Sequence, residues 1–135
     1  MEQRHPLSGL RVLEMGSRTT APYIGKLLTD AGADVLKLES PVGDPFRTWS
    51  ASGASIPDGE DAAWWRFLNA GKKSTTIDLE TDEGKDQFHN LVEETDLILD
   101  DHIPQDAQRL GITYEDIHII SPLSLIHISE PTRPV

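Results

Sequence analysis

The stretch LRVLEMGSRTTAPYIGKLLTDAGADVLKLE, residues 10–39, decides the fold of this chain. Its first apolar run ends at Gly16, where a strand can turn sharply because glycine adopts backbone angles that other residues avoid. A helix is predicted next, with Pro22 in its first turn and Gly32 as a left-handed terminator. The run Val35–Glu39 predicts a second strand. Strand, helix and strand in about thirty residues make a βαβ unit, whose two strands pair in parallel.

The turn at residues 16–21 occupies the place where a doubly wound sheet binds ligands. Such sheets bind them at the carboxyl ends of strands, where a helix N-terminus offers N–H groups to anions. Hydroxyl side chains at 17, 19 and 20 are candidates for the helix cap. The turn has one glycine where a dinucleotide fingerprint has three, and no Walker-type lysine motif follows, so standard NAD and ATP sites are disfavoured. A plain structural connection is the alternative interpretation.

Strands and helices continue to alternate along the rest of the chain. The patterns predict strands at 74–79, 96–100 and 125–128, and helices at 62–68, 82–92, 105–110 and 114–120. A loop rich in proline and glycine spans residues 40–61. The alternation predicts an α/β fold, a Rossmann-like parallel sheet with flanking helices.

Composition excludes several classes of function. The 135 residues suffice for one domain or part of one, and no run is apolar enough for a membrane span or a signal peptide, so a cytoplasmic protein is expected. The chain has no cysteine, and its five histidines lack ligand-like spacing, so no metal is expected. Its net charge of −11 argues against nucleic acid or an anionic membrane as partner. No Gly-x-Ser-x-Gly elbow supports a hydrolase.

Several further stretches point to a family when they are taken together in order. They include Pro6–Glu14, Ala31–Glu39, Gly43–Arg47, Asn69–Ser74 and Arg109–Gly111. In this order and spacing, the chain resembles the class III coenzyme A transferases, which include formyl-CoA and carnitine CoA-transferases and α-methylacyl-CoA racemases. The resemblance covers residues 6 to about 123. It implies the truncated N-terminal part of a larger interlocked-dimer fold.

The resemblance also implies a coenzyme A site at the carboxyl ends of the strands. The residues it places near the cofactor are Gly16, Ser17, Arg18, Thr19, Thr20, Lys37, Arg47, Lys72, Lys73, Asp101, His102 and Arg109. Coenzyme A carries a pyrophosphate and a ribose phosphate, which cations recognise, and residues 72 and 73 form the only adjacent pair of cations in the sequence. A solvated turn is the alternative interpretation of this pair, and the end of a helix is the alternative for residue 109.

The sequence departs from the family pattern at one turn of the site. The family carries asparagine and an aromatic residue where this chain has Asp101 and His102. A carboxylate there is expected to repel phosphate, whereas the imidazole can stack on adenine. An exposed turn histidine without a role is the alternative.

The function implied is that of a CoA-binding N-terminal portion without catalytic activity by itself. In the transferases an aspartate attacks the acyl-CoA carbonyl, and the racemases use a His and Asp pair; neither motif occurs in this chain, so no catalytic residue is predicted. Acyl-CoA and a carboxylic acid are the expected partners, with a homodimer in the full-length form. The alternatives are a racemase-type fragment and a non-catalytic module that binds CoA or a nucleotide.

The chain divides at residue 123 in this interpretation. Residues 1–123 form the N-terminal part of the CoA-transferase-like domain, and residues 124–135 form a tail. The tail resembles a peptide translated from sequencing-adapter DNA, which predicts a non-native segment. A natural, disordered C-terminus after a fifth strand is the alternative.

Overall fold

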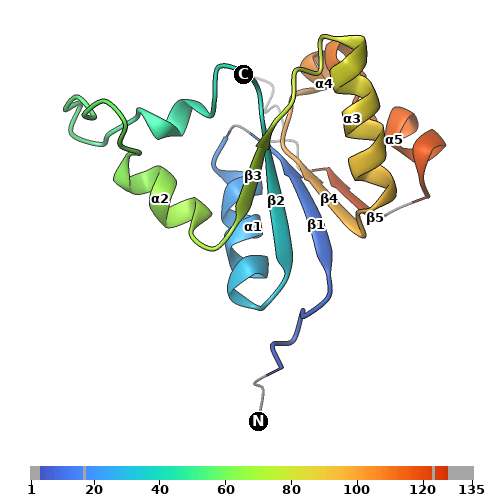
Figure 1. The fold of residues 1–135 in the computed structure, drawn as a ribbon, viewed down its shortest axis with the longest axis horizontal. Coiled ribbons are helices and arrows are strands. Elements are labelled where there is room, and N and C mark those ends of the chain that lie inside the picture. Colours follow the sequence, from blue (N-terminus) through green and yellow to red (C-terminus); the bar gives the residue numbers. More distant parts are fainter. Residues whose placement is uncertain (1–3, 17, 123, 128–135) are drawn as a thin grey trace, which may run out of the picture.

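A five-stranded parallel sheet forms the centre of the molecule (Figure 1). The computed structural model describes residues 4–16, 18–122 and 124–127. The strands lie in the order β3-β2-β1-β4-β5. Their bounds are Arg11–Met15 for β1, Asp34–Glu39 for β2, Lys73–Thr76 for β3, Leu97–Asp100 for β4 and Ser124–His127 for β5. The α/β prediction is confirmed.

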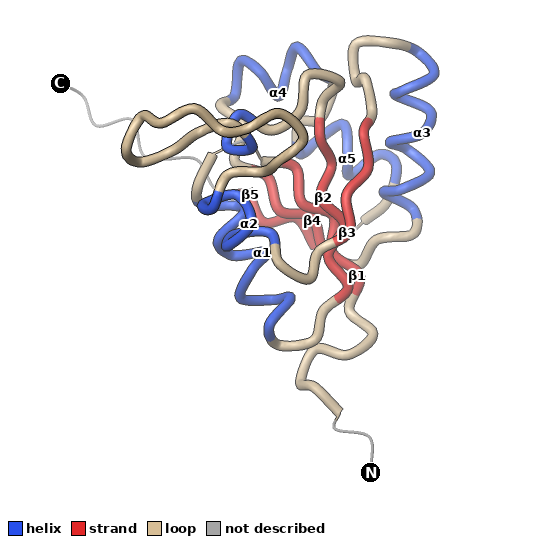
Figure 2. Tube along the Cα trace, turned by 60° about the vertical axis from the view of Figure 1, so that its left-hand side comes forward, coloured by secondary structure: helices blue, strands red, loops and turns tan. Residues whose placement is uncertain are grey.

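Helices cover both faces of the sheet, as Figures 1 and 2 show. One face carries α1 and α2, and the other carries α3, α4 and α5. The helices span Thr20–Asp30, Ala63–Asn69, Asp82–Glu93, Pro104–Leu110 and Tyr114–Ile120, and a 3-10 turn spans Pro45–Arg47. No helix in the described part of the chain is long and apolar enough to cross a membrane.

Alternation along β1 divides the core into two apolar clusters. Val12 faces α1 and packs in one cluster with Ala21 and Val35. Leu13 points the other way, into a larger cluster that contains Phe88 of α3. Because successive strand side chains point to opposite faces, a single apolar strand supplies both layers. Leu13 is in register with Leu36 of β2 and Ile98 of β4, so β1 is a central strand.

Gly16 ends β1 as predicted, but the reason proposed for a glycine there is wrong. Its φ is not positive, unlike the φ of +100° at Gly32 and +71° at Gly111. A Cβ at Gly16 would instead lie 2.7 Å from the Cβ of Ala21 and 2.7 Å from Oδ1 of Asp101. The turn needs a glycine because α1 and the end of β4 approach its backbone closely.

The predicted hydroxyl cap of α1 is also corrected. Thr19 occupies the N-cap position, but its side chain makes no capping hydrogen bond. The backbone N–H of Ala21 donates to Oδ2 of Asp101 at 3.2 Å. A carboxylate from the end of β4 therefore caps the helix. Ser17, the other main candidate, lies outside the described residues.

The third and fifth strands differ in extent from their predictions. The ladder of β3 ends at Thr76 rather than 79, after which the side chains of Ile77 and Leu79 enter the larger apolar cluster. The backbone of Ser124–His127 pairs in parallel with β4. The division at residue 123 and the non-native tail stay predictions, and residues 128–135 lie outside the described part of the chain.

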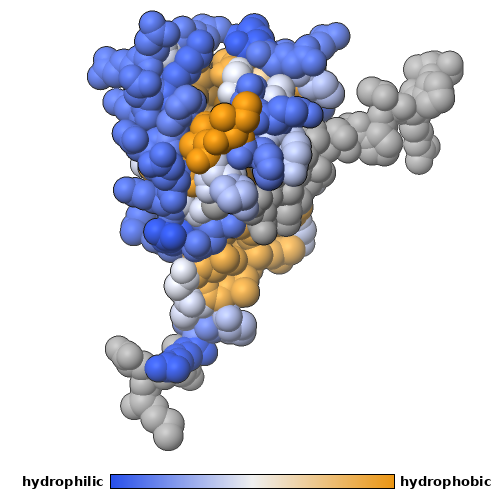
Figure 3. Space-filling model, turned by 90° about the vertical axis from the view of Figure 1, so that its right-hand side faces the viewer, coloured by the Kyte–Doolittle hydropathy of each residue, from blue (hydrophilic) through white to orange (hydrophobic). Residues whose placement is uncertain are grey.

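Figure 3 shows one face of the molecule, which is largely hydrophilic with two apolar areas.

Candidate functional site

A pocket of about 540 Å³ opens at the carboxyl edge of the sheet. Its lining comes from Gly16 after β1, residues 38–45 at the end of β2 and beyond, residues 77–80 after β3, and four residues around α4. The chain runs from β1 toward β2 on one side and places β4 on the other, so this edge is the topological switch point of the sheet. Open α/β sheets bind ligands in such a crevice.

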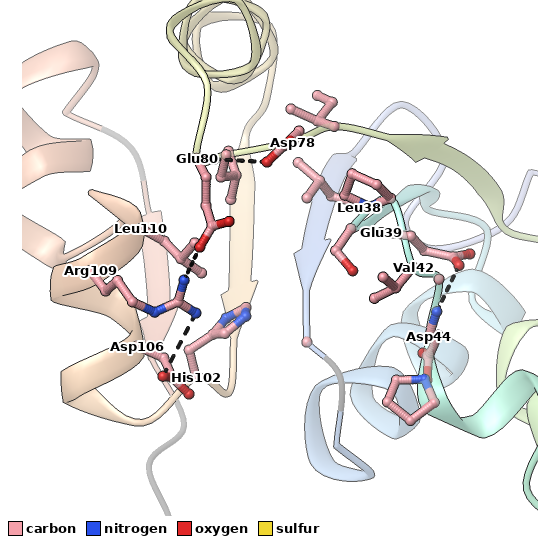
Figure 4. Close-up of a pocket in the computed structure, with 17 residues that line it drawn as sticks. Leu38, Glu39, Val42, Asp44, Asp78, Glu80, His102, Asp106, Arg109 and Leu110 are labelled. Carbon is pink, nitrogen blue, oxygen red and sulfur yellow. Dashed lines mark hydrogen bonds and ion pairs between the residues drawn. The ribbon is translucent and has the colours of Figure 1, made fainter.

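The two walls of the pocket face each other in Figure 4. One wall comes from α4 and the turn before it, and consists of His102, Asp106, Arg109 and Leu110. The segment that follows β2 forms the other, with Val42 95% exposed at its tip. The pocket thus combines apolar side chains with charged groups, as small-molecule sites commonly do.

A buried network of four charges lies between the sheet and α1, behind the second wall. Nζ of Lys37 lies 3.0 Å from Oε2 of Glu14 and 2.9 Å from Oδ2 of Asp44. Nζ of Lys72 lies 2.6 Å from Oε1 of Glu14 and also donates to the carbonyl of Pro22 at 2.8 Å. Buried charges need such partners because each loses its hydration. The network joins β1, β2, α1 and the loop that forms the pocket wall.

The two lysines of this network have pKa values shifted in opposite directions. Burial lowers the pKa of Lys37, but the carboxylates of Glu14 and Asp44 outweigh it and leave that pKa raised. Burial also lowers the pKa of Lys72, and there it outweighs the attraction of Glu14. The difference follows from the partners, since Lys37 has two carboxylates in contact and Lys72 has one.

Arg47 fastens the loop after β2 to the body of the protein. Its guanidinium donates to both carboxylate oxygens of Glu39, at 2.9 and 2.7 Å, and to Asp61 at 2.8 Å. It also stacks on the ring of Trp65, with 3.8 Å to the ring centroid. Hydrogen bonding to Glu39 is the main cause of the raised pKa of Arg47. A forked guanidinium of this kind fixes geometry as well as charge.

His102 is held at the mouth of the pocket by Asp100 of β4. Nδ1 of the imidazole lies 2.5 Å from Oδ1 of Asp100, and the backbone N–H of His102 donates to the same oxygen at 3.0 Å. Burial lowers the pKa of His102, but the carboxylates of Asp100, Asp101 and Asp106 outweigh burial and leave the pKa raised. The imidazole of His102 therefore keeps its proton to a higher pH than a free histidine does.

Arg109 forms an ion pair across the same wall. One of its terminal nitrogens contacts Oε1 of Glu80, and the other lies 3.9 Å from Oδ1 of Asp106. The side chains of Arg109 and Glu80 are 56% and 66% exposed. Among the described residues that line the pocket, Arg109 is the only arginine or lysine and His102 the only histidine.

The predicted cofactor residues that the structure describes fall into four places. Gly16, His102 and Arg109 line the pocket, while Lys37, Lys72, Asp101 and Arg47 make the surrounding contacts described above. Residues 18–20 begin or precede α1. Lys73 lies at the opposite, amino edge, where its 74% exposed side chain lies 3.6 Å from Asp34. Contact of these residues with coenzyme A stays a prediction.

The sequence patterns did not indicate Glu14 and Asp44 of the network, or Glu80 and Asp106 of the pocket. The sequence did contain a signal for Glu14. This residue lies two positions after Val12 in β1, so both side chains point to the same buried face of the sheet. A charge at such a position is an exception that calls for a buried partner.

Among the described residues, no three His, Cys, Asp or Glu side chains are placed to hold a metal ion.

Comparison with known proteins decides the family. The profile described as CoA-transferase family III matches residues 7–129. The chain belongs to this family. It is 40% identical to "Succinyl-CoA--D-citramalate CoA-transferase" of Chloroflexus aurantiacus, over 92% of this chain and 30% of that protein. It is 35% identical to "Succinate--glutarate CoA-transferase" of Agrobacterium fabrum, over 94% of this chain and 32% of that protein.

Solved structures of this family agree with the fold. A CAIB/BAIF family protein of Brucella suis superposes with a TM-score of 0.81 at 37% identity, over 94% of this chain and 33% of that chain. A hypothetical protein of Mycobacterium tuberculosis gives a TM-score of 0.82 at 30% identity, over 97% of this chain and 36% of that chain. This CoA-transferase family III chain spans about a third of the length of these relatives.

Proposed function

We propose that this chain is the CoA-binding N-terminal portion of an enzyme that transfers coenzyme A between an acyl-CoA and a carboxylic acid. The observation that carries the proposal is the family match over residues 7–129. The two relatives described above are both named as CoA-transferases, which favours transferase over racemase chemistry. In the full-length form, we propose a cytoplasmic homodimer with acyl-CoA and a carboxylic acid as partners.

The pocket at the switch point of the sheet is the proposed binding site of coenzyme A. Its volume of about 540 Å³ is in the range of small-molecule sites. Arg109 supplies the positive charge that a phosphate requires, and the imidazole of His102 lines the same pocket. The N–H of Ala21 already donates to the carboxylate of Asp101. The first turn of α1 is therefore less available to an anion than an open helix terminus would be.

The buried lysines support the site without entering it. Lys37 and Lys72 are each held by Glu14, and their side chains are only 1% exposed. Lys37 also holds Asp44, which belongs to the pocket wall. We therefore propose that these two lysines position the wall, and that the described pocket residues bind the ligand rather than carry the covalent step.

The proposal is tested by isothermal titration of the chain with coenzyme A. One saturable site is expected, and Arg109→Gln is expected to weaken binding about tenfold because a charge-assisted contact to phosphate is lost. Arg66→Gln is the matched control, since Arg66 is exposed on α2 and does not line the pocket. Circular dichroism establishes that each variant is folded. A folded wild-type chain that gives no binding heat and displaces no fluorescent CoA analogue would overturn the proposal.

A further inference from the structure

We propose that Glu80 sets the affinity of the pocket for phosphate by occupying the guanidinium of Arg109 in the ligand-free protein. The inference rests on the proposed function, because it concerns how that same pocket receives coenzyme A. Glu80 makes this site an exchange site, in which a ligand phosphate must displace a carboxylate of the chain itself.

The geometry places the two groups face to face at the rim of the pocket. Glu80 follows β3, Arg109 lies near the end of α4, and 29 positions of sequence separate them. Both line the pocket, and Figure 4 shows the carboxylate of Glu80 directed toward the guanidinium. The second guanidinium edge faces Asp106 at 3.9 Å. Arg109 therefore has carboxylates on two sides before any ligand enters.

The balance of charge in the pocket makes this competition significant. Two of the lining carboxylates are neutralised from behind, because Glu39 binds Arg47 and Asp44 binds Lys37. Asp78, Glu80 and Asp106 remain, against the guanidinium of Arg109 and the imidazole of His102. A phosphate dianion that enters thus meets a surplus of negative charge, and Glu80 is the carboxylate in direct contact with the group that must bind it.

The ion pair is weak enough to be exchanged. Both partners are more than half exposed, and exposed ion pairs of this kind contribute little to stability. A phosphate can instead accept two parallel hydrogen bonds from the guanidinium, which is a stronger arrangement. Glu80 consequently lowers phosphate affinity without blocking it, and its effect depends on Arg109.

The experiment is a double-mutant cycle on coenzyme A affinity, measured by isothermal titration of the whole chain. Glu80→Gln is expected to tighten coenzyme A binding about threefold to tenfold, because it removes both the competitor and a like charge. The gain is expected to grow at low salt and to be small in an Arg109→Gln background. Glu93→Gln, which makes the same charge change at an exposed position at the end of α3, is expected to leave affinity unchanged.

Two ligands and the cycle separate the outcomes. Pantetheine, which has no phosphate, is expected to show no gain with Glu80→Gln, and dephospho-CoA identifies whether the ribose phosphate or the pyrophosphate carries the gain. An unchanged coenzyme A affinity in folded Glu80→Gln would overturn the inference, as would an equal gain with and without Arg109. Absence of binding by the wild-type chain would instead overturn the proposed function.

Discussion

Lys37 carries a charge that the fold buries almost completely. Its side chain is 1% exposed, and both of its ionic partners, Glu14 and Asp44, are at most 2% exposed. A buried ion pair adds little to stability compared with apolar residues of the same size, but the loss of one partner leaves an uncompensated charge. Loss of the Lys37 charge is therefore expected to destabilise the fold more than loss of an exposed lysine charge.

Replacing Lys37 tests this account. Lys37→Met is expected to lower the free energy of unfolding by about 3–5 kcal/mol, because the carboxylates of Glu14 and Asp44 lose their shared cation. Urea denaturation followed by circular dichroism measures the change. Lys85→Met, at an exposed position of α3, is the control and is expected to change stability by less than about 0.5 kcal/mol. A similarly small effect at Lys37 would contradict the account.

His102 gives the second prediction for a single residue, which concerns pH. Its folded pKa is raised above the unfolded value, since carboxylates outweigh burial. The stabilisation is therefore complete below the unfolded pKa of about 6.5 and is lost as pH rises through the higher folded pKa. We expect the wild type to lose stability relative to His102→Gln as pH rises from about 6 to 8.

The pH prediction is measured as the difference between the melting temperatures of the two proteins across this range. The variant retains Asp100, so the comparison isolates titration of the imidazole. His89→Gln, on the exposed side of α3, is the control and is expected to follow the wild type. A difference that grows in favour of the wild type with rising pH would show that the sign is wrong.

At the scale of the element, α1 illustrates a conflict between helix propensity and packing. Gly25 lies inside the helix, where alanine ordinarily gains about 0.5–1 kcal/mol. In this helix a Cβ would lie 2.0 Å from Oε1 of Glu14 and 3.1 Å from Nζ of Lys72. We expect Gly25→Ala to lower the free energy of unfolding by about 1–3 kcal/mol because the helix must move away from the sheet.

Chemical denaturation of the wild type and of Gly25→Ala decides whether helix propensity or packing determines the effect. Gln87→Ala in α3 supplies the comparison, because this side chain is exposed and alanine there has only the helix preference to act on. It is expected to be neutral or slightly stabilising. A Gly25→Ala variant more stable than the wild type would exclude close packing of α1 against the buried charges.

Element ends were predictable from sequence where their signals are local. Gly111 ends α4 with a φ of +71°, and Thr113 and Asp116 form a reciprocal capping box at α5, as short-range patterns of this kind indicate. The cap of α1 was not predictable, because Asp101 lies 80 positions away from Ala21. Only the pairing of β1 with β4 brings them together.

The same distinction applies to the candidate site. Gly16, His102 and Arg109 were identified by family resemblance and do line one pocket. The contacts that make Lys37 and Lys72 internal depend on Glu14, which is 23 positions from one and 58 from the other. Such contacts follow from the register of the sheet and from the packing of α1, neither of which the pattern of single residues contains.

At the scale of the whole molecule, the sheet order predicts how stability is distributed. β1 lies between β2 and β4 with helices over both faces, whereas β3 pairs only with β2 in the described part of the chain and three of its four residues are exposed. Backbone amides at a thinly covered edge open by local fluctuation, and central amides exchange only through larger openings.

Hydrogen exchange measured by mass spectrometry tests this distribution. We expect the amides of β1 and β4 to be the slowest to exchange, and those of β3 to exchange about tenfold or more faster. Peptides from α3, which packs on the larger apolar cluster through Phe88 and Val92, are expected to fall between these limits. Equal protection of β1 and β3 would contradict the expectation.

The four buried charges behind the pocket also constrain how this protein can change over evolutionary time. Glu14, Lys37, Asp44 and Lys72 lie on separate segments but share their ionic bonds, so the effect of altering one depends on the other three. A mutation that neutralises Lys37 is harmful alone and becomes acceptable once Glu14, Asp44 and Lys72 have also become apolar, because Lys72 depends on Glu14 for its carboxylate partner. These positions therefore form an epistatic unit, and descendants of the chain are expected to keep or replace them as a set.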